Sequence, residues 1–306
     1  VPIRSYPTFA ILGIENKHKP RAVTGIVAPS VWENERVQAT TDRRGSSAER
    51  KRRDRVVPDQ HGAWGFLALP VVLGAAAGGW SWLLLPVTAA WFVAYPLSWA
   101  ISGRLTAPRR AERFNRAVLV WTALAVPVMV AALIAVPWLF WVGFAYLIPF
   151  GANLAFARAR RERDLANDLV FVAECMFVVP VVAAVGAGNR GWALPIDQMA
   201  TPEVALMMVV CAVTLIGATL HVKSLIRERR NPKYAAGSKA FAVASIPIVA
   251  VAALLTGESM VIVLPMLVLV GRALFLHNPN LKPGRLGIIE LVCLIAVAGT
   301  ALFVLR

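Results

Sequence analysis

The positive charges of this chain follow a regular pattern beyond residue 60. Long apolar runs succeed one another there, and 18 of the 20 Lys and Arg residues lie in every second gap between the runs. A soluble core has no reason to sort charge in this way, whereas the cytoplasmic loops of membrane proteins retain Lys and Arg. The pattern therefore predicts a polytopic membrane protein. The gaps that hold the charge are residues 104–116, 158–163, 223–239 and 272–285, and the two exceptions are Arg190 and Arg306.

The composition agrees with this class. Of the 306 residues, 58% are hydrophobic and 16% are charged, and mean hydropathy is +0.63; soluble domains carry about 25% charged residues. A formal net charge of +15 is also typical of nucleic-acid-binding proteins. Because loop sorting accounts for the charge, we predict the lipid bilayer as the partner and no binding of nucleic acid.

A bilayer core of about 30 Å needs about 20 helical residues per crossing. Applied to the apolar runs, this length predicts an all-α transmembrane helical bundle of about nine helices. An odd number of crossings with basic inner loops places the N-terminus in the cytoplasm and the C-terminus outside. The predicted spans are 62–79, 82–101, 117–136, 138–157, 166–187, 203–222, 238–256, 259–276 and 287–305.

The first 57 residues differ from the rest of the chain. They contain the basic run Arg50-Lys51-Arg52-Arg53, have no sustained apolar period, and end just before Pro58. We expect residues 1–57 to form a disordered basic N-terminal arm, and residues 58–306 to form the transmembrane helical domain. Two interpretations of the arm stay open: an over-extended start of the reading frame, and a polybasic segment that binds anionic lipid.

Unusual polar residues concentrate at the predicted inner ends of the spans. Asp164, Asn167 and Asp168 share one helical face, and Glu174 lies deeper on nearly the same face. Lys223 and Arg227 form a basic pair that could hold a phosphate or a carboxylate. An ionisable group within a span is expensive and is a functional candidate by default. The candidate ligand-binding residues are therefore His61, Asp164, Asn167, Asp168, Glu174, His221, Lys223, Arg227 and Glu290.

Each of these residues also has a structural interpretation. The acidic stripe could be a buried pairing with an arginine, and the basic end of the sixth span could contact lipid headgroups. Cys175, Cys211 and Cys293 lie inside apolar runs without metal-ligand spacing, so we expect small core residues and no metal site. No hydrolase, nucleotide-binding or haem-attachment motif occurs, so the catalytic residues and the cofactor stay unknown.

Three segments together resemble the YwiC-like family of bacterial integral membrane proteins. The first is Gln60-His61-Gly62-Ala63-Trp64 with Pro70 and Gly74, the second is residues 163–168, and the third is residues 221–229. The resemblance covers about residues 57–306 and leaves the arm unmatched. It implies a multi-pass protein of the bacterial cytoplasmic (inner) membrane whose biochemical role is uncharacterised.

A weaker likeness is to UbiA-type prenyltransferases, which also have nine membrane helices and acidic motifs at the cytoplasmic face. That likeness implies Asp164 and Asp168 as Mg²⁺ ligands that hold a prenyl diphosphate. The sequence departs from the pattern, since the loop of residues 104–116 contains no aspartate and the loop after the sixth span offers only Glu228.

The sequence thus leaves three hypotheses of function and does not decide whether the chain is an enzyme. The first is a cytoplasm-facing polar pocket that binds or transports an anionic or amphiphilic small molecule. The second is a prenyl-diphosphate-dependent transferase. The third is a non-catalytic membrane assembly partner whose basic inner face docks another protein.

Overall fold

The computed structural model describes residues 56–58, 62–106, 111–276 and 283–305 of the chain. Within these ranges all regular structure is helical and no strand occurs, which confirms the predicted all-α polytopic bundle. His61, a candidate site residue, and residues 1–55 of the predicted N-terminal arm lie outside the described residues. The long elements are α2 (Ala63–Gly78), α3 (Leu84–Thr106), α4 (Glu112–Ala135), α5 (Leu139–Arg158), α6 (Leu165–Gly186), α8 (Pro202–Ile226), α9 (Pro232–Thr256), α10 (Leu264–Phe275) and α11 (Pro283–Val304).

These nine elements match the nine predicted spans in order, but two of them are short. Seven described helices are long and apolar enough to cross a membrane by length and composition. The first predicted span is only 16 residues long as α2, which is about 24 Å of helix. The eighth begins as a 3-10 helix, η2 (Met260–Val263), capped by Ser259, and continues as the 12-residue α10. A chain with seven such helices is a multi-pass membrane protein.

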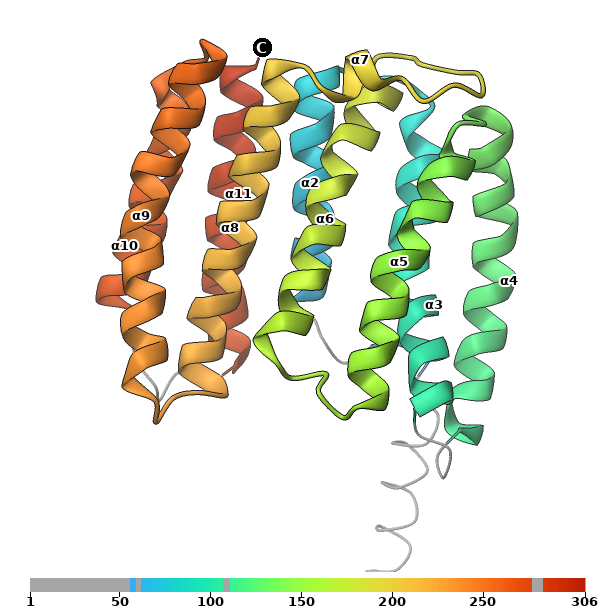
Figure 1. Cartoon of the computed structure of the whole chain (residues 1–306), viewed down its shortest axis with the longest axis horizontal. Helices are drawn as coiled ribbons and strands as arrows, with labels where there is room; N and C mark the ends of the chain where they lie inside the picture. Colours follow the sequence, from blue (N-terminus) through green and yellow to red (C-terminus); the bar gives the residue numbers. More distant parts are fainter. Residues whose placement is uncertain (1–55, 59–61, 107–110, 277–282, 306) are drawn as a thin grey trace, which may run out of the picture. The chain divides into compact units, whose positions relative to one another are not determined.

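Successive long helices run in opposite directions, so the connections alternate between two ends of the bundle (Figure 1). We define the basic end as the end where α3, α5, α8 and α10 finish and where α4, α6, α9 and α11 begin. The sorted Lys and Arg residues of the sequence belong to this end. The opposite end holds the C-terminus and the loop between α6 and α8, which contains the short helix α7 (Ile196–Met199).

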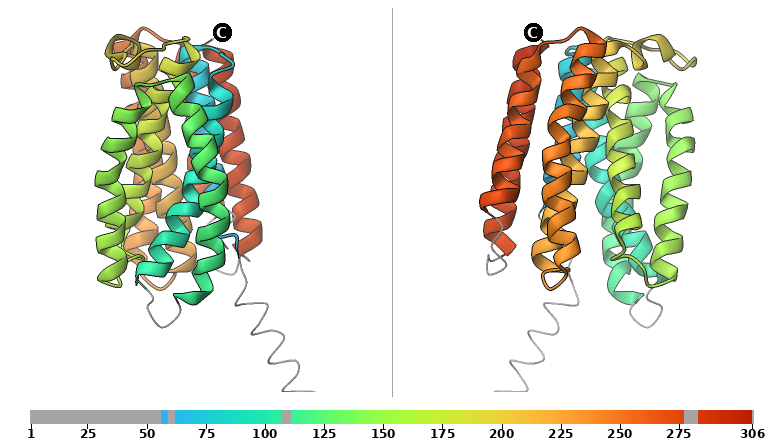
Figure 2. Two further views of the ribbon diagram at one scale, coloured as in Figure 1. Left: turned by 90° about the vertical axis from the view of Figure 1, so that its right-hand side faces the viewer. Right: turned by 60° about the vertical axis from the view of Figure 1, so that its left-hand side comes forward.

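Helices α2 and α6 pack against each other in the middle of the bundle. On one side of this central pair, α6 contacts α5 and α3, and α4 packs on α3. On the other side, both central helices contact α8, and α8 packs on α9. Figures 1 and 2 show α4 and α9 on opposite sides of this central pair. Glycines permit the close approach of α2 and α6, because a Cβ at Gly78 would lie 2.0 Å from the carbonyl oxygen of Ala183.

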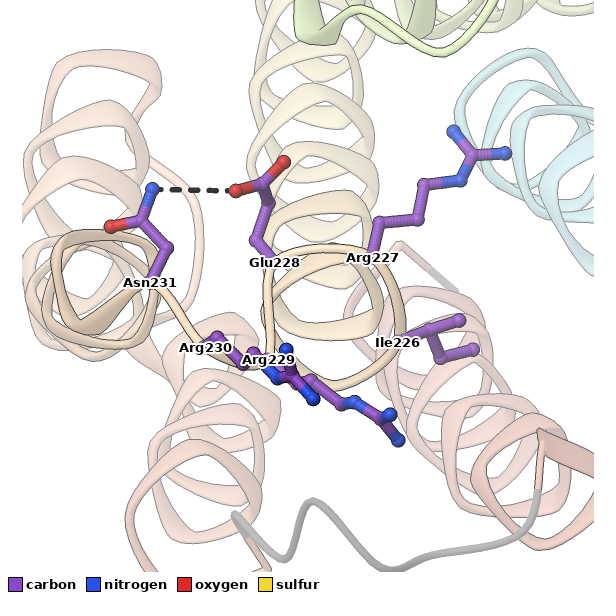
Figure 3. A pocket seen from close by; sticks show the side chains of 6 residues that line it. All are labelled: Ile226, Arg227, Glu228, Arg229, Arg230 and Asn231. Carbon is purple, nitrogen blue, oxygen red and sulfur yellow. Dashed lines mark hydrogen bonds between the residues drawn. The ribbon is translucent and has the colours of Figure 1, made fainter. Parts of the chain in front are cut away.

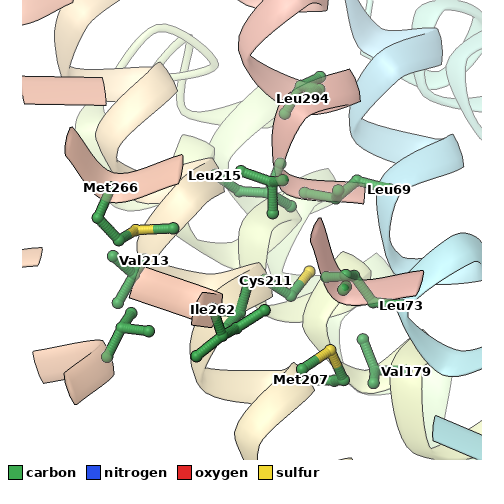
Figure 4. Packing of buried hydrophobic residues seen from close by; sticks show 14 of the residues in the cluster. Leu69, Leu73, Val179, Met207, Cys211, Val213, Leu215, Ile262, Met266 and Leu294 are labelled. Carbon is green, nitrogen blue, oxygen red and sulfur yellow. The ribbon is translucent and has the colours of Figure 1, made fainter. Parts of the chain in front are cut away.

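The larger hydrophobic cluster joins α2, α6 and α8 to the C-terminal helices. Figure 4 shows its residues converging from these helices, among them Leu73, Val179, Met207 and Cys211. Much of the surface of α4 and α5 is apolar and exposed, for example Ile134 and Ile148. Because water would make such a surface costly, it is suited to contact with lipid tails.

Candidate functional site

An ion pair joins α6 to α8 near the basic end. Asp164 has an extended backbone and precedes α6, so Asp168 falls in the first turn of that helix. Lys223, near the end of α8, donates from Nζ to Oδ2 of Asp168 at 2.6 Å and to the carbonyl oxygen of Arg163 at 2.7 Å. The Lys223 side chain is only 5% exposed. Two predicted site residues, Asp168 and Lys223, are thus in direct contact.

Arg227 is the second basic residue near Asp168. Its Nη1 lies 4.0 Å from Oδ1 of Asp168, and its side chain is 43% exposed, compared with 26% for Asp168. This distance allows an electrostatic attraction but is longer than a hydrogen bond. The Arg227 guanidinium is therefore held loosely beside the ion pair and remains accessible from the basic end.

The rest of the predicted acidic stripe does not join this contact. Asp164 forms an exposed ion pair of 2.6 Å with Arg161, three residues earlier. Asn167 donates from Nδ2 to the carbonyl oxygen of Glu162 at 3.2 Å, and its buried Oδ1 has no hydrogen-bond partner among the described residues. Helical spacing predicted one shared face, but Asp164 lies before α6, and the partners of Asp164 and Asn167 belong to the segment that precedes this helix.

Glu174 lies in a separate polar contact between α5 and α6. Its Oε1 accepts a hydrogen bond of 2.7 Å from Nδ2 of Asn153, and its carbonyl oxygen accepts one of 2.7 Å from the Tyr146 hydroxyl. Neither Asn153 nor Tyr146 was among the site residues predicted from the sequence. The available signal was an asparagine within an otherwise apolar span, since such a side chain needs a partner in a membrane.

Glu290 belongs to a third polar contact, with Arg272. Arg272 was predicted to be a loop charge, but it lies inside α10, where its Nη1 donates to Oε2 of Glu290 on α11. The two side chains are 2% and 9% exposed. Arg272 is near the end of an apolar helix, so composition alone did not distinguish a loop charge from a buried one.

His221 is fully buried on α8, one turn before Ser224, whose hydroxyl donates to the His221 carbonyl oxygen at 2.7 Å. It lies near the end of α8, as predicted. The predicted residues that the structure describes therefore fall into separate contacts: Asp164 with Arg161, Asp168 with Lys223 and Arg227, Glu174 with Asn153, and Glu290 with Arg272.

A cavity of about 450 Å³ lies at the turn between α8 and α9. Asn231 orders this turn, because it accepts from the Lys233 backbone N–H at 3.2 Å and donates to Glu228 at 3.3 Å. Figure 3 shows Glu228 turned toward Asn231, and Arg227 extending away from them. The cavity is lined by Ile226, Arg227, Glu228, Arg229, Arg230 and Asn231.

The two carboxylates that the prenyltransferase likeness implies as Mg²⁺ ligands lie in separate ion pairs. Asp164 contacts Arg161 and Asp168 contacts Lys223, so each carboxylate is neutralised by a basic side chain. In the part of the chain that the structure describes, no three His, Cys, Asp or Glu residues are grouped so that they could hold a metal ion. The assignment of Asp164 and Asp168 as Mg²⁺ ligands stays a prediction of the prenyltransferase hypothesis.

Comparison with known proteins supports the family read from the sequence motifs. A family model described as YwiC-like protein matches residues 57–183, which include α2 to most of α6. The uncharacterized protein YwiC of Bacillus subtilis (strain 168) is 28% identical over 187 residues, covering 59% of this chain and 71% of that protein. An uncharacterized protein of Haemophilus influenzae (strain Rd) is 24% identical over 235 residues, covering 77% of this chain and 92% of that protein.

No solved structure matches this chain at a significant level. The family model and the two relatives confirm the resemblance carried by the sequence motifs: residues 57–183 of this multi-pass membrane chain match the YwiC-like family, and both relatives are described as uncharacterized.

Proposed function

We propose that this chain resides in the bacterial cytoplasmic membrane and binds an anionic or amphiphilic small molecule at its cytoplasmic face, as a carrier or as a receptor. The observation that carries the proposal is the cavity of about 450 Å³ at the turn between α8 and α9. Three of its six lining residues are arginines, Arg227, Arg229 and Arg230. Guanidinium groups bind phosphate and carboxylate oxygens through paired N–H donors, so an anion is the favoured ligand.

An amphiphilic ligand suits the position of the cavity. Ile226, the last residue of α8, contributes apolar surface and is 44% exposed. The cavity also lies at a helix end of a membrane-spanning bundle, where the lipid headgroup region begins. A ligand with an anionic head and a short apolar tail could therefore contact arginine and isoleucine together.

Arg227 links the cavity to the helix packing. It lines the cavity and also lies 4.0 Å from Asp168, the carboxylate that joins α6 to Lys223 of α8. An anion that draws the Arg227 guanidinium into the cavity removes one attraction from Asp168. This gives a physical connection between ligand binding and the contact of two central helices, as a carrier requires.

Hexyl phosphate and inorganic phosphate are suitable probes. Calorimetric titration of the purified full chain in detergent should give saturable binding of hexyl phosphate, and tighter binding than for phosphate, because the alkyl tail buries apolar surface. Combined Arg227→Gln, Arg229→Gln and Arg230→Gln should weaken hexyl phosphate binding more than about tenfold, since each charged hydrogen bond contributes about 1.5 to 3 kcal/mol. Flux of hexyl phosphate into proteoliposomes separates a carrier from a receptor.

Arg190→Gln is the matched control, because Arg190 is an exposed arginine in the loop at the opposite end of the bundle. It should leave the affinity for hexyl phosphate at the wild-type value. Absence of binding by the wild-type protein, or equal binding by the triple variant, would contradict the proposed function.

A further inference from the structure

Arg272 and Glu290 form an ion pair inside the membrane-spanning part of the chain. Arg272 lies on α10 and Glu290 on α11, and their side chains are 2% and 9% exposed. Buried ionisable groups in membrane-spanning helices are expensive, and in membrane proteins they mark pathways for ions and substrates. The pair involves none of the residues that line the cavity at the α8–α9 turn, so it is independent of the function proposed above.

The ion pair uses only one side of the guanidinium. Nη1 of Arg272 donates to Oε2 of Glu290. Nε and Nη2 of Arg272, and Oε1 of Glu290, are buried without a hydrogen-bond partner among the described residues. Nε and Nη2 carry parallel N–H bonds along one edge of the planar group, and this edge matches the two oxygens of a carboxylate. Among the described residues this edge therefore donates to no oxygen, and the Cys293 thiol of α11 lies beside the guanidinium.

Gly217 of α8 and the Phe241 ring of α9 lie near this edge. A Cβ on Gly217 would lie 3.7 Å from the Phe241 ring and 3.9 Å from Nη2 of Arg272. Thr214, one turn earlier on the same face of α8, and Ser238 of α9 have buried hydroxyl oxygens without a partner among the described residues. An apolar contact between helices has no need of such groups, whose burial without partners costs about 1 to 3 kcal/mol each.

Charge balance restricts how an anion can bind there. The Arg272–Glu290 pair is neutral, so adding a carboxylate alone leaves one net negative charge in a buried site. If Glu290 takes up a proton at the same time, the site remains neutral, because the new carboxylate replaces Glu290 as the counter-charge. The bound state then holds one anion, one proton and no unpaired charge.

We propose that Arg272 binds the carboxylate of a small organic acid through Nε and Nη2, and that Glu290 releases the guanidinium by taking up one proton. The proton comes from the solvent and moves onto a carboxylate oxygen of Glu290, whose ion pair with Nη1 breaks as the ion pair with the organic acid forms. Arg272 is the binding residue, and Glu290 is its proton-dependent competitor.

Other titratable and charged groups lie on the helices packed around the pair. His221 and Lys223 belong to α8, Lys239 to α9, and Arg285 to the start of α11. The Cys293 thiol, one turn beyond Glu290 on α11, lies beside the guanidinium. Lys223 is already paired with Asp168. His221 is the principal competing proton acceptor, and the test therefore includes a variant of it.

Acetate and butyrate are the probes. Calorimetric titration of the purified full chain, in two buffers of different ionisation enthalpy, gives both the affinity and the number of protons taken up. We expect one proton per carboxylate bound, and an affinity that falls about tenfold for each unit of increase in pH, because raising the pH removes the proton that binding requires. Chloride cannot accept from Nε and Nη2 through two separate oxygens as a carboxylate does. It should therefore not compete with acetate at equal concentration.

Arg272→Lys is the most informative variant. It retains a cation opposite Glu290, so the ion pair and the fold can persist, but it lacks the planar edge. Acetate binding should be lost while the melting temperature without acetate stays close to wild type. Glu290→Gln should bind acetate without proton uptake and independently of pH, and added acetate should raise its melting temperature. His221→Gln should keep the uptake of one proton.

Several outcomes would overturn the proposal. They are no binding of acetate or butyrate by the wild-type protein, wild-type binding by Arg272→Lys, binding without proton uptake, and loss of proton uptake in His221→Gln but not in Glu290→Gln. If Glu290→Gln does not fold, the wild-type proton count and Arg272→Lys still decide the question. Arg190→Gln, an exposed arginine variant at the opposite end, should leave acetate binding unchanged.

Discussion

At the scale of single residues, burial separates two aspartates that are four positions apart, one just before α6 and one in its first turn. Asp168 pairs with Lys223, which is 5% exposed, whereas Asp164 pairs with the largely exposed Arg161. Asp168→Asn leaves the buried ammonium without its counter-charge, and we expect a loss of about 2 kcal/mol in the free energy of unfolding. Asp164→Asn should cost less than about 1 kcal/mol. Equilibrium unfolding in detergent measures both; equal losses would show that burial of Lys223 is not decisive.

Two replacements of Glu174, by glutamine and by leucine, should differ in their effect on stability. Its Oε1 accepts from Asn153, and a glutamine can also accept there through its amide oxygen. Glu174→Gln should therefore retain nearly wild-type stability, while Glu174→Leu should lose about 1 to 3 kcal/mol by leaving the Asn153 amide without its partner. The melting temperature of each purified variant is the measurement. Restoration of stability in Glu174→Leu by a second change, Asn153→Leu, would support the assignment, and its absence would contradict it.

Sequence spacing predicted part of the candidate site at this scale. Local periodicity predicted one helical face for Asp164, Asn167 and Asp168, of which Asp164 lies before α6, and position within an apolar run singled out Glu174 and Glu290. Spacing along the chain could not identify the partners of these residues, because Lys223 is 55 positions from Asp168 and Arg272 is 18 positions from Glu290. These pairings depend on which helices are neighbours, and a single apolar pattern does not encode that.

At the scale of elements, the contact of α2 with α6 depends on the absence of side chains. A Cβ at Gly78 would lie 2.0 Å from the carbonyl oxygen of Ala183, and the backbone cannot move away without separating the helices. We expect Gly78→Ala to destabilise the protein by about 2 kcal/mol, as overpacking typically does. Gly143→Ala on α5 is the control, since its Cβ meets nothing within 4 Å. Thermal unfolding of both variants tests this; a neutral Gly78→Ala would mean that the helices separate at little cost.

Helix order and type followed from the apolar runs, but helix lengths did not. A left-handed glycine, Gly257, ends α9, and Ser259 then caps a 3-10 turn before α10 begins. These local caps shorten the eighth span although hydropathy continues through it. Hydropathy measures the cost of placing a segment in lipid, whereas helix bounds depend on backbone hydrogen bonds at each end.

At the scale of the whole molecule, the sorted charge predicts which end faces the cytoplasm. All loops at the basic end should be cytoplasmic, and the loop between α6 and α8 should be outside. Glu162 and Asp197 are exposed residues of the two kinds of loop, and the three native cysteines are buried. Asp197→Cys should react with a membrane-impermeant maleimide in intact cells. Glu162→Cys should react only after the cells are permeabilised.

The same measurement bears on both proposed sites, because each requires a side of the membrane. The arginine-lined cavity lies at the basic end, and Arg272 lies near that end of α10. If Glu162→Cys is labelled in intact cells and Asp197→Cys is protected, the bundle has the opposite orientation, and a cytoplasmic ligand cannot reach the cavity directly. The expected labelling, of Asp197→Cys in intact cells and of Glu162→Cys only after permeabilisation, would place the Arg229 and Arg230 guanidinium groups at the cytoplasmic surface. Their positive charge attracts anions from solution there before any specific contact forms.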